Sequence, residues 1–235
     1  MVDPGPVVEE LRLHLPIARE GGDPEGAHQV RVATRRLRGF LELQDMRALA
    51  DDLRWLRNAA QRVRDIDVVT AANPPEPFRC WLCDQRAPAR SALLHALDSP
   101  RTGGLTQALS LIPPGDEALA RKRTKALAKR VAKLATVLDE QEPELDELHR
   151  LRRAIRRLRY ALEWLGDDAK PVKRVQEALG ELGDVRATFE LLEEFPEAGD
   201  LGDFQRELWA RVHSGHHKAR KAWRKARTSV IKVRS

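Results

Sequence analysis

Apolar residues recur every three to four positions along most of the chain, which places them on one face of an α-helix. Between Pro24 and Leu49 this face carries Val30, Ala33, Leu37, Phe40 and Leu41. A second stretch, from Glu144 to Leu165, repeats the pattern with Leu151, Ala154, Ile155, Leu158 and Leu162. No segment shows the sustained alternation that is typical of a β-strand. The pattern therefore predicts an all-α chain.

Glycine and proline clusters divide these helices from one another. We expect breaks at 21–26, 73–77, 103–104 and 113–115, and another at 166–168. The predicted helices cover 7–19, 24–49, 51–70, 78–97, 116–138 and 144–165, and a further helix starts at Pro171. A loop from Pro196 to Gly202 then leads to a long C-terminal helix.

One string on the polar side of the pattern occurs twice. The sequence HQVRVATRRLR, from His28 to Arg38, returns 121 positions later as HRLRRAIRRLR, from His149 to Arg159. At about 100° per residue, the histidine and the arginines at offsets 3, 7 and 10 fall within roughly 80° of arc. The two stripes are His28, Arg31, Arg35 and Arg38, and His149, Arg152, Arg156 and Arg159. Neither string contains an acidic residue, so each helix has an apolar face and a cationic face.

A second block extends the duplication. The segment from Leu53 to Ile66 aligns with the segment from Val172 to Val185 at an offset of 119. Two successive blocks at nearly one offset indicate an internal repeat, which we place at 1–112 and 113–235. We expect two antiparallel four-helix bundles related by a pseudo-twofold axis, with the two stripes lining a basic central groove.

Composition supports a polyanion as the partner. The 235 residues carry a formal net charge of +6, and the basic residues gather on the predicted helices. The sharpest acidic run, 139–147, stands before the second stripe, where it can fold back over the arginines. No long apolar run or signal-like segment occurs, so we expect a cytoplasmic protein without a membrane partner.

The sequence shows few signs of cofactor or metal chemistry. Cys80 and Cys83 form a lone C-x-x-C, which lacks both the βαβ setting of a redox motif and two further zinc ligands. We expect this pair to serve helix packing. No P-loop occurs, and no pair of acids lies within a stripe. We therefore expect no metal, no cofactor and no catalysis.

At these residues the chain resembles the CHAD family, the conserved-histidine α-helical domain, from about Val7 to Thr228. The resemblance rests on the two histidine–arginine strings and on the element from Val63 to Val68. It implies a pair of four-helix bundles whose basic cavity binds inorganic polyphosphate and does no catalysis by itself. Family members often follow a triphosphate-tunnel domain, whose alternating glutamate motif is absent from this sequence, so we expect a stand-alone member.

We expect the phosphate contacts to come from both strings. The first group is His28, Arg31, Arg35, Arg36, Arg38, His149, Arg152, Arg156, Arg157 and Arg159. Secondary contacts are expected from Arg54, Arg57, Arg64, Lys173, Arg220 and Arg224. Arginine presents a planar, permanently charged fork to phosphate oxygens. A bound phosphate also draws histidine into its cationic form, so binding should strengthen as the pH falls.

Three alternatives stay open at this point. Basic helices also bind nucleic acid or polyanions in general, although the stripes have few interleaved aromatic residues for stacking on bases. An enzyme of phosphoanhydride metabolism is a second alternative. A scaffold that recruits proteins to polyphosphate granules is a third, and it is compatible with polyphosphate binding. The sequence leaves the oligomeric state undetermined.

Overall fold

A computed structural model describes residues 2–196 and 201–234 of the chain. Across these residues the protein is built from helices and contains no β-strand, apart from an isolated bridge between Val2 and Gly115. The all-α prediction is therefore confirmed. The chain divides into two compact units at the junction of Asp116 and Glu117. None of the described helices has both the length and the apolar character needed to cross a membrane.

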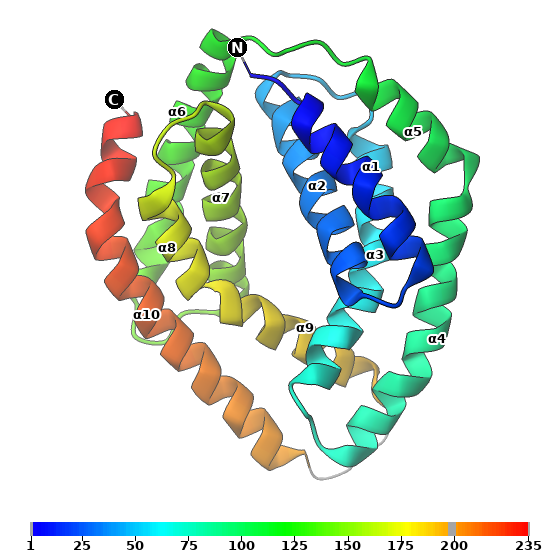
Figure 1. Cartoon of the computed structure of the whole chain (residues 1–235). Helices are drawn as coiled ribbons and strands as arrows, with labels where there is room; N and C mark the ends of the chain where they lie inside the picture. The colour runs from blue at the N-terminus through cyan, green and yellow to red at the C-terminus, as the bar shows by residue number, and fades with distance from the viewer. Residues whose placement is uncertain (1, 197–200, 235) are drawn as a thin grey trace. The chain divides into compact units, whose positions relative to one another are not determined.

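Five α-helices make up the described part of the first unit (Figure 1). They are α1 (Gly5–Glu20), α2 (Pro24–Leu43), α3 (Ala50–Ala71), α4 (Glu76–Asp98) and α5 (Pro100–Ser110). Helix α2 packs between α1 and α3, and α4 packs on α3 and also contacts α1. Helix α5 contacts α1, α3 and α4. The unit thus contains one helix more than the four that we expected in each repeat.

The apolar face of α2 forms the centre of this unit. Its residues Val30, Ala33, Leu37, Phe40 and Leu41 are at most 1% exposed, as the sequence pattern predicts. Helix α1 approaches this helix closely at Gly26, where an added Cβ atom would lie 2.5 Å from the backbone nitrogen of Ala18. Because one face of α2 is buried in the core of this unit, the opposite, cationic face points away from that core.

The second unit contains α6 (Glu117–Leu134), the 3-10 helix η1 (Ala135–Asp139), α7 (Leu145–Trp164), α8 (Lys170–Ala178), α9 (Gly180–Glu194) and α10 (Gly202–Arg234). Helix α7 packs on α6 and α8, and α10 packs on α6, α8 and α9 (Figure 1). The core between them includes Leu151, Ile155 and Leu158 of α7, all fully buried. As in α2, burial of the apolar face of α7 makes its cationic face point away from the core of its unit.

Two predicted boundaries in the first unit are wrong. Helix α2 ends at Leu43 rather than at Leu49, because Asp45 and Leu49 adopt left-handed backbone angles, with φ of 58° and 63°. Gly103 and Gly104 were expected to form a loop but lie inside α5. The Ser99 side chain accepts a hydrogen bond from the Arg101 backbone and so caps α5, while Leu105 and Leu109 are buried and hold the helix in place.

The second unit differs from the sequence prediction in its later helices. The helix expected from Pro171 is split into α8 and α9 at Leu179. The basic helix α6 ends at Leu134 and continues as η1. Of the loop predicted from Pro196 to Gly202, residues 197–200 lie outside the described residues, and α10 begins at Gly202 as expected. The internal duplication and the central groove stay predictions.

Candidate functional site

The first cationic stripe lies on the outer face of α2. His28, Arg31, Arg35 and Arg38 are all half-buried. Arginine is normally among the most exposed residues. Four half-buried cationic or ionisable side chains along one helix face therefore distinguish this surface from an ordinary solvated one.

Helix α3 adds further cations to the same surface. Burial lowers the pKa of His28, and the nearby Arg64 guanidinium lowers it further. Burial likewise lowers the pKa of Arg57, and Arg38 and Arg35 contribute to the same effect. His28 lies near Arg64, toward the end of α3, and Arg38 lies near Arg57, toward its beginning. The two helices therefore run antiparallel, with their cationic faces on the same surface. We call His28, Arg31, Arg35, Arg38, Arg57 and Arg64 the first basic cluster.

Acidic residues neutralise this cluster only in part. Arg38 Nε donates to Glu42 Oε1 at 3.2 Å, and Glu25 raises the pKa of His28 against the stronger lowering causes. Among the described residues, the buried Nε atoms of Arg35 and Arg57 have no hydrogen-bond partner. Arg121, by contrast, pairs with Glu117 and Asp167, and these acids raise its pKa. The first basic cluster is therefore under mutual repulsion that an anion would relieve.

The second stripe has the same form on α7. His149, Arg152, Arg156 and Arg159 are half-buried. Burial lowers the pKa of His149 to about 4, and the next cause is the charge of Arg186, followed by Arg153, Arg152 and Arg156. His149 is consequently neutral near pH 7. We call His149, Arg152, Arg156, Arg159 and Arg186 the second basic cluster.

The break between α8 and α9 holds Arg152 in position. Arg152 Nε donates to the Leu179 carbonyl oxygen at 3.0 Å. The guanidinium lies over Gly183, where an added Cβ atom would be 2.4 Å from the Arg152 Cζ atom. In the sequence Gly183 aligns with Arg64, and its lack of a side chain leaves space for the Arg152 guanidinium.

The last arginine of each stripe is paired within its own helix. Arg159 Nε lies 2.9 Å from Glu163 Oε1, as Arg38 Nε lies 3.2 Å from Glu42 Oε1. The Arg159 guanidinium also lies 4.8 Å from the centre of the Tyr160 ring. In each pair the acid follows the arginine by four residues. Glu42 and Glu163, which lie just beyond the two strings, therefore extend the similarity between them, and we did not use these acids in the sequence analysis.

Arg186 on α9 is a member of the second basic cluster that sequence reasoning missed. It is half-buried, forms an ion pair with Asp146, and donates to Glu190 Oε1 at 2.8 Å. Asp146 belongs to the acidic run 139–147, and Asp139 of that run lies 3.8 Å from Arg220. Two members of the run thus approach basic side chains. The sequence does contain a signal for Arg186. At the position aligned with the cation Arg64 the second segment has Gly183, and an arginine, Arg186, follows three positions later.

Several other predicted contacts are not members of either cluster, although Arg54 is close enough to Arg57 to lower its pKa. Arg36 forms a 2.7 Å ion pair with Glu10 of α1, because its offset of eight residues places it roughly 120° from the centre of the stripe. Arg157 has the same offset on α7 and is half-buried. The remaining candidates have these environments: Arg54 is exposed and 3.0 Å from Asp51, Lys173 is exposed and 3.8 Å from Glu177, Arg220 is half-buried, and Arg224 is exposed.

The cysteines and possible metal ligands give no second site. Cys80 and Cys83 are both free and exposed on α4, so the expectation that the pair serves helix packing is wrong. Within residues 2–196 and 201–234, no group of three or more histidine, cysteine or acidic side chains is arranged to hold a metal ion.

Comparison with known proteins identifies a family and two solved structures that are similar to most of the chain. Residues 6–193 match the sequence model of the CHAD domain. The crystal structure of the CHAD domain from the plant Ricinus communis is 27% identical, with a TM-score of 0.66 over 98% of this chain and 87% of that one. PptA from Streptomyces chartreusis is 17% identical and has the same fold, with a TM-score of 0.63 over 97% of this chain and 96% of that one. No curated protein matches the chain.

Proposed function

The chain belongs to the CHAD domain family, and we propose that it binds inorganic polyphosphate through its two basic clusters without catalysing a reaction. The observation that carries the proposal is the repetition of one half-buried histidine–arginine stripe, on α2 and again on α7. A long polyanion with identical repeating charges is the ligand that gains most from two equivalent cationic surfaces.

The chemistry of polyphosphate suits these clusters. It carries about one negative charge per phosphate and has no base to stack or read, so its binder needs donors aimed at oxygen atoms. Arginine supplies two parallel N–H donors for such oxygens, and charge-assisted hydrogen bonds are about twice as strong as neutral ones. The partner-free Nε atoms of Arg35 and Arg57 are donors of this kind within the described residues.

The absence of catalysis is part of the same proposal. Phosphoryl transfer generally needs metal-holding carboxylates or a nucleophile placed beside the phosphate. In the first basic cluster the Glu42 carboxylate is engaged with Arg38. In the second cluster Glu163 and Glu190 are likewise engaged with Arg159 and Arg186. These acids orient arginines, which serves binding.

A double variant tests the site. Arg35→Ala with Arg156→Ala removes one central arginine from each cluster and should weaken polyphosphate binding at least about 100-fold, since each charged hydrogen bond contributes about 1.5–3 kcal/mol. Helicity measured by circular dichroism should be unchanged, because alanine is the best helix former. The affinity is measured by titration calorimetry with long-chain polyphosphate.

The matched control removes two exposed arginines from pairs with nearby acids, again one in each unit. Arg79 lies 3.8 Å from Glu76, and Arg206 pairs with Asp203. Arg79→Ala with Arg206→Ala causes the same loss of charge and should weaken binding less than about threefold. Equal losses in the two double variants would contradict the site, and an unchanged affinity in Arg35→Ala with Arg156→Ala would contradict it as well.

A further inference from the structure

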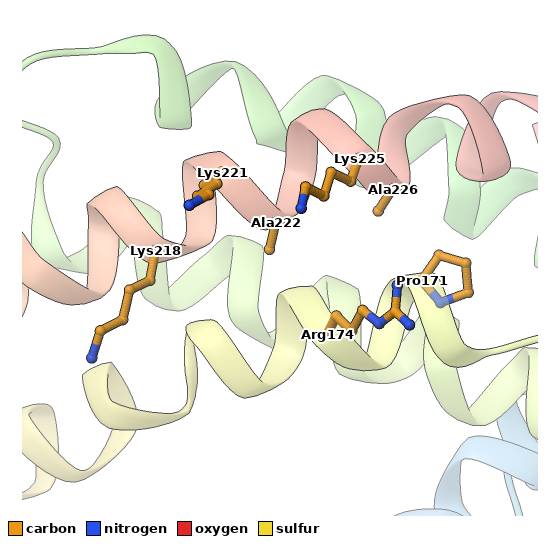
Figure 2. A pocket seen from close by; sticks show the side chains of 7 residues that line it. All are labelled: Pro171, Arg174, Lys218, Lys221, Ala222, Lys225 and Ala226. Carbon is orange, nitrogen blue, oxygen red and sulfur yellow. The ribbon is translucent and has the colours of Figure 1, made fainter.

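A cavity on the second unit lies between α8 and α10 and includes no member of the second basic cluster. Its volume is about 430 Å³, which falls in the range of small-molecule sites. Figure 2 shows Pro171 and Arg174 on α8 facing Ala222 and Ala226 of α10 across it. Three lysines of α10 complete the lining: Lys218, Lys221 and Lys225.

The cations around this cavity have little local compensation. The lysines occur at offsets 0, 3 and 7, so they follow one face of α10 over about 10 Å. Lys218 donates to Glu181 Oε1 at 3.0 Å. Within the described ranges 2–196 and 201–234, Lys221, Lys225 and Arg174 form no ion pair. Three such cations around one cavity favour a multiply charged anion over a single carboxylate.

The floor of the cavity has a different chemistry from its rim. Pro171, Ala222 and Ala226 present only apolar side chains, and Ala226 is 2% exposed. A bare phosphate chain gains nothing from such a floor, because burying apolar surface stabilises a complex only when the ligand is apolar there too. The ligand should therefore combine several negative charges with an organic body.

We propose that this cavity binds a nucleoside triphosphate. The base would lie on the Pro171 ring and the Arg174 guanidinium, since bases stack on guanidinium planes. The triphosphate would then lie along Lys221 and Lys225, whose ammonium groups act as point charges for phosphate oxygens. This inference is independent of polyphosphate binding, because the cavity uses no residue of either basic cluster.

Titration of the whole chain with adenosine triphosphate, inorganic tripolyphosphate and adenosine tests the proposal. In the chain carrying Arg35→Ala with Arg156→Ala, whose basic clusters are weakened, adenosine triphosphate should bind at least about tenfold more tightly than tripolyphosphate, which has the charges and lacks the base. Lys221→Ala with Lys225→Ala should weaken adenosine triphosphate binding about tenfold or more. Ala222→Leu, which fills the floor, should remove the preference for adenosine triphosphate over tripolyphosphate.

The control for the lysine pair is Lys129→Ala with Lys133→Ala on α6. These lysines are also exposed and four residues apart, so the change in net charge and spacing is the same. This variant should alter the affinity by less than about twofold. Equal binding of the two phosphates to the chain with weakened basic clusters, or equal losses in the two lysine pairs, would overturn the proposal. Arg35→Ala with Arg156→Ala should leave adenosine triphosphate binding unchanged, and a matching loss there would assign the nucleotide to the basic clusters instead.

Discussion

At the scale of single residues, the two stripes share a sequence and differ in environment. Burial is the largest cause of the lowered pKa of both His28 and His149. His149 has four arginines around it, and its pKa falls to about 4. Glu25 offsets part of the effect at His28. Both histidines are therefore poised to take up a proton when an anion arrives, and they do so from different starting points.

The pH dependence of binding follows from these shifts. A bound phosphate raises the pKa of each histidine, so the complex takes up protons and its affinity increases as the pH falls. The increase begins at the raised pKa of the complex and ends at the lowered pKa of the free protein, so for His149 it continues down to about pH 4. Polyphosphate titrations across this range are the measurement. His28→Gln with His149→Gln should flatten the profile, while the exposed His95→Gln should not; a flat profile for the unaltered chain would make both histidines structural.

Asp146 gives a second prediction at this scale. Its carboxylate pairs with Arg186 and so competes with phosphate for that guanidinium. Asp146→Asn should raise polyphosphate affinity by up to about fivefold at low salt, since an exposed ion pair contributes up to about 1 kcal/mol. Asp203→Asn removes an acid from an exposed pair with Arg206 and serves as the control in the same calorimetric titration. Equal gains in both variants would mean that only net charge matters.

At the scale of helices, the two units position the arginines of their basic clusters in different ways. Helix α3 is continuous and contributes Arg57 and Arg64 to its cluster. The corresponding segment in the second unit breaks at Leu179, and the freed carbonyl oxygen accepts from Arg152. The break between α8 and α9 therefore positions Arg152 of α7, whereas the continuous helix α3 contributes arginines of its own to the cluster.

Gly183→Ala tests this role of the broken helix. The new methyl group would lie 2.4 Å from the Arg152 Cζ atom, so the guanidinium must move away from Leu179. Polyphosphate affinity should fall by about threefold to tenfold, while the melting temperature stays equal or rises, because alanine favours a helix over glycine by about 1 kcal/mol. Gly180→Ala, where nothing lies within 4 Å, should raise stability without loss of affinity. Equal affinities for the two variants would remove Gly183 from the site.

The helix scale also shows what the sequence could and could not predict. The 3.6-residue pattern located the buried face of α2 and α7, and the position of the stripes follows from it because the opposite face then points away from the core. The split at Leu179 and the helical Gly103 and Gly104 were not predictable in this way, since both depend on packing and capping contacts. Arg186 was missed for a similar reason: its place beside His149 comes from tertiary contact between α7 and α9.

At the scale of the whole molecule, each compact unit carries one basic cluster. If a polyphosphate chain is long enough to contact both clusters, as the proposal requires, its affinity should exceed that of either cluster alone. Short polyphosphate should lose this advantage. Two basic clusters would also attract nucleic acid by charge alone, so the decisive property is selectivity at raised salt.

The most direct test is a titration of the whole chain with long-chain polyphosphate and with duplex DNA, each at about 50 and 200 mM salt. The account predicts tight polyphosphate binding that persists at the higher salt, and DNA binding that is weaker at equal phosphate and is lost there. Equal affinity for the two polyanions, falling together as salt is raised, would show that the basic clusters are a general cationic surface and would contradict the assignment to polyphosphate.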